Sequence, residues 1–102
     1  EAAVDPEEAL VASAASCHML TFLWLAANAG FNIESYEDNA EGLMATTDAG
    51  KQWISTITLD PQIVWTGDKI PTAEELAALH HEAHEVCYIA NSIKSEVVVK
   101  GI

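Results

Sequence analysis

Arginine is absent from the sequence, and the four lysines are its only basic residues, against sixteen acidic ones. The formal net charge is −12 at pH 7. A surface this acidic repels phosphate groups, so the composition argues against a nucleic-acid partner and against binding to anionic membranes. Solubility is a sufficient explanation for the charge itself.

Charged residues are also absent from Ala9 to Ala27 when His18 is neutral. That length approaches a membrane span. However, polar residues interrupt the segment, and the nearest basic residue is the distant Lys51, so the flanking charges of a span are missing. A secretion signal would need a basic start. We therefore expect a buried central helix in a soluble, cytoplasmic protein with no membrane partner.

Cysteine is scarce, with only Cys17 and Cys87 in the chain. In a reducing compartment, two cysteines are more typical of catalysis or metal binding than of a static disulfide. The alternative is that both are ordinary small hydrophobic residues of the core.

The chain of 102 residues is short enough for a single domain, 1–102, yet half of its residues are hydrophobic. A domain of this size buries only part of its surface. The surplus apolar surface predicts a symmetric homodimer.

Start signals predict two helices. Asp5, Pro6 and Glu8 form a capping-box pattern ahead of a helix that runs to about Asn28, and we expect this helix to be buried on nearly all faces. Thr72 begins a second helix in the same way, which extends to about residue 91.

Strand signals occupy the rest of the chain. Residues 33–47 and 51–66 predict an antiparallel hairpin around a turn at 48–50, with Pro61 at a bulge or edge, and residues 92–100 alternate as a last strand. The predicted class is therefore α+β. Three strands make a thin sheet for so apolar a helix, so we expect preceding N-terminal strands or a partner chain to complete it.

The position of Cys17 poses an electrostatic problem. It lies about three turns inside the first helix, where the helix dipole no longer lowers the pKa of a thiol. A buried thiol without a positive neighbour stays protonated. His18 is adjacent, but successive helical residues do not face each other. A reactive Cys17 thus requires a positive group that the sequence does not identify.

The histidines raise an alternative, a structural metal site. His80, His84 and Cys87 follow helical spacing on one face, and the Cys17–His18 pair could add ligands of types that zinc accepts. The competing interpretation is that His80 and His84 form hydrogen bonds at a helix surface. We predict no metal and no cofactor.

Two segments resemble the OsmC/Ohr family, named for osmotically inducible and organic-hydroperoxide-resistance proteins. They are DPEEAL at 5–10, continuing to ASCHM at 15–19, and HHEAHEVCYIANS at 80–92. The family has a Pro-Glu-Glu-Leu-like helix start, a cysteine ten residues after the first Glu, and a second cysteine that closes the later helix. Glu7 and Cys17 have this spacing.

The resemblance implies an intertwined dimer with two central helices and mixed sheets, and it implies a chemistry. The cysteine that matches Cys17 attacks the O–O bond of an organic hydroperoxide, and the one that matches Cys87 resolves the sulfenic acid as a disulfide. A dithiol reductant of the dihydrolipoyl type restores both thiols. The glutamate that matches Glu7 orients an arginine that stabilises the thiolate.

The sequence departs from the family pattern in two places. The family arginine comes from N-terminal strands that these residues lack, so we expect an N-terminally truncated domain. Tyr88 follows Cys87 where better-studied branches have proline. The leading hypothesis is a Cys-based peroxidase, and the alternative is a non-enzymatic dimer that binds a small apolar ligand.

Overall fold

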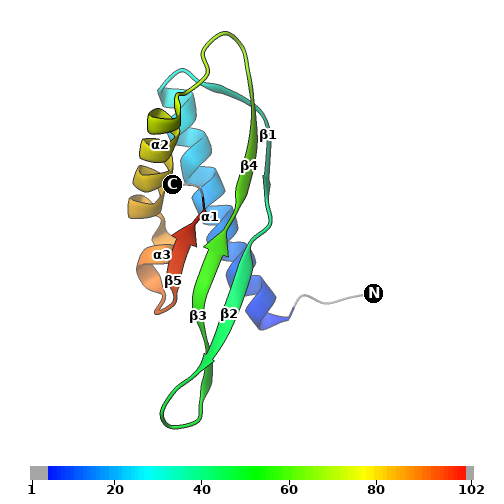
Figure 1. Ribbon diagram of the computed structural model, residues 1–102, viewed down its shortest axis with the longest axis vertical. Helices are drawn as coiled ribbons and strands as arrows, with labels where there is room; N and C mark the ends of the chain where they lie inside the picture. The colour runs from blue at the N-terminus through cyan, green and yellow to red at the C-terminus, as the bar shows by residue number, and fades with distance from the viewer. Residues whose placement is uncertain (1–4, 101–102) are drawn as a thin grey trace.

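A long helix packs against two small sheets and a second, shorter helix in a computed structural model that describes residues 5–100 (Figure 1). The elements in chain order are α1 (Pro6–Asn28), β1 (Asn32–Asp38), β2 (Glu41–Thr46), β3 (Gln52–Leu59), β4 (Pro61–Thr66), α2 (Ala73–Val86), α3 (Tyr88–Ser92) and β5 (Glu96–Val99). The predicted α+β class is confirmed.

The ends of α1 follow from local sequence. The Asp5 carboxylate accepts a hydrogen bond from the Glu8 N–H at 2.7 Å, and the Glu8 carboxylate accepts one from the Asp5 N–H at 3.3 Å, which confirms the predicted capping box. At the other end Gly30 adopts a φ of 90°, a value that other residues rarely take. The predicted end near Asn28 is correct.

One stripe of α1 is buried, and its opposite face is open. Leu20 and Trp24 are 61% and 67% exposed. The prediction of a helix buried on nearly all faces is therefore wrong for the single chain, because the sheets and α2 cover only one side. By length and composition α1 could cross a membrane, but core helices of soluble proteins meet the same criterion. The buried residues of the stripe are Ala14, His18, Phe22 and Ala26.

The strands form two sheets. β1 pairs with β4 in an antiparallel ladder, and β2, β3 and β5 form a second sheet in that order. The hairpin turn at 48–50 is confirmed between β2 and β3. The prediction of two unbroken strands is wrong, since each divides in two. The Asp38 carboxylate accepts a hydrogen bond from the Asp60 N–H at 2.7 Å where both strands pass from one sheet to the other, and Pro61 begins β4.

The final strand lies parallel to β3. Ile57 pairs with Val97 and Leu59 with Val99, and these four residues form one core cluster with Ala14 of α1. The predicted alternation is confirmed, but β5 is shorter than the predicted 92–100. A second cluster lies between α1, α2 and the β1–β4 sheet, and its buried members are Phe22, Ala26, Phe31 and Ala83.

The second helix begins as predicted and ends early. The Thr72 hydroxyl accepts from the Glu75 N–H at 3.1 Å, and the Glu75 carboxylate accepts from the Thr72 N–H at 2.9 Å. Cys87 then takes an extended conformation, with φ −69° and ψ 116°, which ends α2 at Val86. The helix predicted to reach residue 91 is therefore two helices, α2 and α3.

Candidate redox site

The fold brings Cys17 and Cys87 together. Cys17 lies in the middle of α1, and Cys87 occupies the joint between α2 and α3. Both of these shorter helices pack along α1 (Figure 1). The two thiols are close enough for each to shift the pKa of the other. Both cysteines are free thiols, Cys17 half-buried and Cys87 only 1% exposed. The half-buried sulfur is thus the more accessible of the pair.

The surroundings of Cys17 favour its thiolate. Burial alone raises the pKa of the Cys17 thiol. Hydrogen bonds from the Cys87 thiol and from the backbone N–H groups of Ile89 and Tyr88 lower it by more, so the net pKa lies below its ordinary value. A thiolate is the nucleophilic form of cysteine. The site therefore activates Cys17.

The surroundings of Cys87 have the opposite effect. Burial raises the pKa of its thiol, and the hydrogen bond to Cys17 raises it further, against a smaller opposing effect of the Ala90 N–H. Cys87 therefore stays protonated and can donate its S–H to the Cys17 thiolate. The surroundings of the two sulfurs thus move their pKa values in opposite directions. Such a difference lets one thiol react as a thiolate while an identical group stays protonated.

The sequence did not reveal how Cys17 is stabilised. The absence of arginine led us to expect a positive group from outside these residues. Within the described residues, the Cys87 thiol and two backbone N–H groups already lower the pKa of Cys17. These N–H groups are free to point at a sulfur because the helix breaks at Cys87. The sequence predicted an unbroken helix there, which would have committed the same N–H groups to internal hydrogen bonds.

Glu7, the third predicted site residue, lies away from the thiols. It is exposed near the start of α1, and the ten residues between Glu7 and Cys17 correspond to about 15 Å along a helix. Glu7 cannot contact the Cys17 of its own chain. It lines a groove of about 900 Å³ between the first turns of α1 and strand β2.

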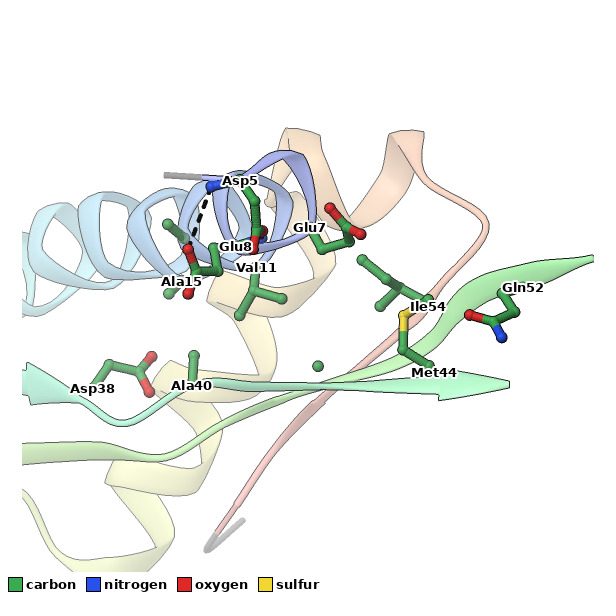
Figure 2. Close-up of a pocket in the computed structure, with 12 residues that line it drawn as sticks. Asp5, Glu7, Glu8, Val11, Ala15, Asp38, Ala40, Met44, Gln52 and Ile54 are labelled. Carbon is green, nitrogen blue, oxygen red and sulfur yellow. Dashed lines mark hydrogen bonds between the residues drawn. The ribbon is translucent and has the colours of Figure 1, made fainter. Parts of the chain in front are cut away.

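This groove has an apolar floor and an acidic rim. Figure 2 shows Val11 pointing from α1 toward β2, with the carboxylates of Asp5, Glu7 and Glu8 around the helix start. Asp38 adds a fourth acidic side chain. Burial raises the pKa of Asp38, and one of its oxygens has no hydrogen-bond partner. The groove thus joins apolar contact surface to negative charge.

The ligands of the alternative metal site do not assemble in the described part of the chain. Within residues 5–100 no group of three or more His, Cys, Asp or Glu side chains is arranged to hold a metal ion. His80, expected at a helix surface in the competing interpretation, is instead buried and forms a hydrogen bond with His18. The sequence did contain a signal for the burial of His80, because it shares the apolar face of α2 with Leu76, Leu79 and Ala83.

The fold is that of an α+β protein whose two cysteines lie close together, and comparison with known proteins places this fold in a family. The sequence model of the family described as OsmC-like protein matches residues 1–101. The chain belongs to this family. A comparison with curated proteins finds no match.

Solved structures of the family resemble this chain closely. An OsmC-like protein of unknown function from Vibrio cholerae has 48% identity and a TM-score of 0.91 over 94% of this chain. An organic hydroperoxide resistance protein OsmC from Legionella pneumophila has 27% identity and a TM-score of 0.74 over 98% of this chain. The chain spans 62% of the Vibrio protein and 69% of the Legionella protein.

A more distant relative shares the fold alone. The organic hydroperoxide resistance protein OhrB of Bacillus subtilis has 18% identity and a TM-score of 0.69, and the match covers 98% of this chain and 73% of that protein. The OsmC/Ohr fold predicted from the two sequence segments is therefore confirmed.

Proposed function

We propose that this chain carries the redox couple of a thiol-dependent peroxidase for organic hydroperoxides, with Cys17 as the attacking thiol and Cys87 as the resolving thiol. The observation that carries the proposal is the proximity of the two sulfurs, with the pKa of Cys17 lowered and that of Cys87 raised. The names of the Legionella and Bacillus relatives support the substrate class.

In the first step, the Cys17 thiolate attacks one oxygen of the hydroperoxide. An S–O bond forms and the O–O bond breaks, so the substrate leaves as an alkoxide and takes up a proton to become an alcohol. Cys17 is oxidised to a sulfenic acid, and the hydroperoxide is reduced by two electrons.

In the second step, Cys87 loses its proton and attacks the sulfur of the Cys17 sulfenic acid. An S–S bond forms and the hydroxyl group leaves as water. A small dithiol then restores both thiols by exchange and is itself oxidised to a disulfide. A dihydrolipoyl group is the reductant class that the family resemblance implies, and no cofactor or metal takes part.

Glu7 enters the proposal as a positioning residue in the groove. Its proposed role is to hold an arginine that stabilises the Cys17 thiolate, and such an arginine has to come from outside these residues, because the sequence contains none. A homodimer is part of the same proposal. The exposed side chains of Leu20, Trp24, Leu43 and Met44 support it by leaving apolar surface to cover.

The expected location is the cytoplasm, where thiols are kept reduced.

The test is intact-mass analysis before and after one equivalent of cumene hydroperoxide. Formation of the disulfide removes two hydrogen atoms, so we expect a loss of about two mass units per chain. Cys17→Ser should abolish the change. Cys87→Ala should instead leave a gain of about sixteen mass units, because the sulfenic acid then has no thiol to resolve it. An unchanged mass of the native chain would contradict the proposal.

A second candidate function rests on the groove between α1 and β2. Its volume of about 900 Å³ and its apolar floor are within the range of small-molecule sites. This candidate is a non-enzymatic dimer that binds a small apolar ligand. It predicts saturable binding of an apolar fluorescent probe that survives replacement of both cysteines, whereas the peroxidase activity would not.

A further inference from the structure

A pair of histidines joins the two helices that carry the cysteines. The Nε2 atom of His18 on α1 lies 3.0 Å from the Nδ1 atom of His80 on α2. Both residues are buried, at 1% and 4% exposed. The rings are nearly parallel, and Phe22 stacks on the His80 ring with centroids 4.3 Å apart. The contact is thus a well-enclosed hydrogen bond between side chains.

The hydrogen bond requires at least one neutral ring to accept it. Burial lowers the pKa of both histidines to about 4, and for His18 the neighbouring His80 and His84 lower it as well. At neutral pH one ring therefore donates and the other accepts. The Nδ1 atom of His18 is buried without a partner, so the His80 hydrogen bond is the only one that the ring makes among the described residues.

Few other charged groups lie near the pair. Asp60, which follows β3, and Lys100, which follows β5, line a small pocket that also reaches His80. On α2, His84 lowers the pKa of His18, and on β1 the Tyr36 ring packs against Phe22. Burial is the cause of the lowered pKa of His80, to which neither Asp60 nor Lys100 contributes.

The two histidines are placed to control the distance between the thiols. His18 follows Cys17 directly on α1. His80 precedes Cys87, the residue that caps the end of α2, by seven residues, and both are buried. Apart from the contact between the thiols, the His18–His80 bond is the only side-chain hydrogen bond between α1 and α2 in residues 5–100.

We propose that His18 and His80 are positioning residues for the thiol pair. The hydrogen bond between the two histidines fixes the position of α2 along α1 and so holds Cys87 against Cys17. Apolar contacts between helices are non-directional and tolerate a shift of one helix along the other. A buried hydrogen bond does not tolerate such a shift, because it weakens steeply with distance and angle. When it breaks, it leaves unpaired polar atoms in the interior. Single buried polar pairs fix register between helices in the same way in coiled coils.

The thiol pair tolerates only a small displacement of one helix relative to the other. A disulfide requires Cα atoms within about 7 Å. A shift of α2 by one helical turn is about 5.4 Å, enough to separate the sulfurs. The inference rests on the proposed redox pairing of the two cysteines, but not on the nature of the oxidant.

The experiment measures the dithiol–disulfide equilibrium of the protein in glutathione redox buffers, with no peroxide present. Oxidised glutathione accepts the two electrons and two protons of the thiol pair and becomes two reduced molecules. We expect His18→Leu and His80→Leu each to lower the equilibrium constant for the protein disulfide about tenfold, which raises its reduction potential by about 30 mV. Because the two residues form one bond, the double variant should lose little more than either single variant.

Two kinds of control separate positioning from general loosening. His18→Gln and His80→Asn retain a polar atom near Nε2 and Nδ1, respectively, and should restore most of the equilibrium constant. Leu79→Ala removes an apolar contact from the same cluster without touching the hydrogen bond, and it should lower stability while leaving the equilibrium constant within about twofold.

The outcomes are distinct from those of the peroxide test. The positioning role is overturned if the leucine variants keep the native equilibrium constant, if Leu79→Ala lowers it equally, or if the native chain forms no internal disulfide in glutathione. A chain that forms the disulfide in glutathione but keeps its mass with cumene hydroperoxide loses the peroxidase function and retains the positioning role.

Discussion

The thiols of Cys17 and Cys87 lie close together, and their interaction moves their pKa values in opposite directions. The two residues come from different helices, so the relationship depends on how those helices pack. In the proposed peroxidase, the lowered pKa suits Cys17 to the role of nucleophile and the raised pKa suits Cys87 to the role of donor. Four predictions follow from this site and from the packing that supports it.

Replacing Cys87 should change the acidity of Cys17. In Cys87→Ala the donor thiol is lost, so the pKa of Cys17 should rise and its alkylation at neutral pH should slow. Cys87→Ser keeps an O–H donor and should retain the lowered pKa. The measurement is the rate of reaction with iodoacetamide across pH. Equal rates for the alanine variant and the native chain would show that the hydrogen bond does not stabilise the thiolate.

Acid should destabilise the protein through His18 and His80. Their pKa values of about 4 lie below the ordinary 6.5, so the unfolded chain binds more protons between these values. The free energy of unfolding should therefore fall as the pH drops from about 6.5 toward 4, by up to about 1.4 kcal/mol per pH unit for each ring.

Urea denaturation at several pH values measures this dependence. The His18→Leu/His80→Leu double variant is the control, because it retains the carboxylates and removes only the two rings. It should lose less stability than the native chain over the same range. Parallel pH profiles for the two proteins would assign the acid sensitivity to other groups.

Gly42 provides a test of how closely β2 approaches α1. A Cβ atom at this position would lie 2.8 Å from Cγ2 of Val11, too close without a shift. Gly42→Ala should lower the free energy of unfolding by about 1–3 kcal/mol, the usual cost of overpacking. In a Val11→Ala background the same change should cost much less.

Gly50→Ala is the matched control for this pair. Gly50 has open space around it but a φ of 83°, so its substitution costs backbone strain rather than a clash. Val11→Ala should therefore not rescue it. If Val11→Ala fails to rescue Gly42→Ala as well, the contact between β2 and α1 is looser than described.

Lys69 should stabilise the end of α1. Its ammonium group donates to the carbonyl of Ala29 and lies 4.8 Å from the centre of the Phe31 ring. The last turn of α1 has no basic residue of its own, so Lys69 supplies the positive charge that favours a helix C-terminus. Lys69→Met should lower the free energy of unfolding by about 1 kcal/mol.

The effect of Lys69→Met should shrink in high salt, which screens exposed charges. Lys51→Met, in the exposed hairpin turn, should change stability by less than about 0.5 kcal/mol. Equal losses for the two lysine variants would contradict a specific role for Lys69.

Local signals in the sequence predicted the helix starts, the hairpin turn and the alternation of the last strand. These features depend on residues within one turn of each other, such as Asp5 with Glu8 and Thr72 with Glu75. The family resemblance selected the two cysteines and the fold. Their contact could not be derived from spacing, because it depends on the packing of α2 against α1.

The features that the sequence did not predict are tertiary. The strands divide at a hydrogen bond between Asp38 and Asp60, which are far apart in the sequence. The end of α2 at Cys87 overrides a good helical pattern, and the pairing of His18 with His80 buries two residues that composition alone treats as surface groups. In each case a long-range contact outweighs a local preference.

Cys87 ends α2 and caps α3, and its sulfur accepts a hydrogen bond from the N–H of Ala90 at 3.5 Å. Any reaction at that sulfur therefore alters the first turn of a short helix. The Ala90 amide is in this sense a native reporter, whose hydrogen-exchange rate records the state of the thiol without a label. An NMR spectrum of the amides could follow the oxidation of the site through a group that takes no part in the chemistry.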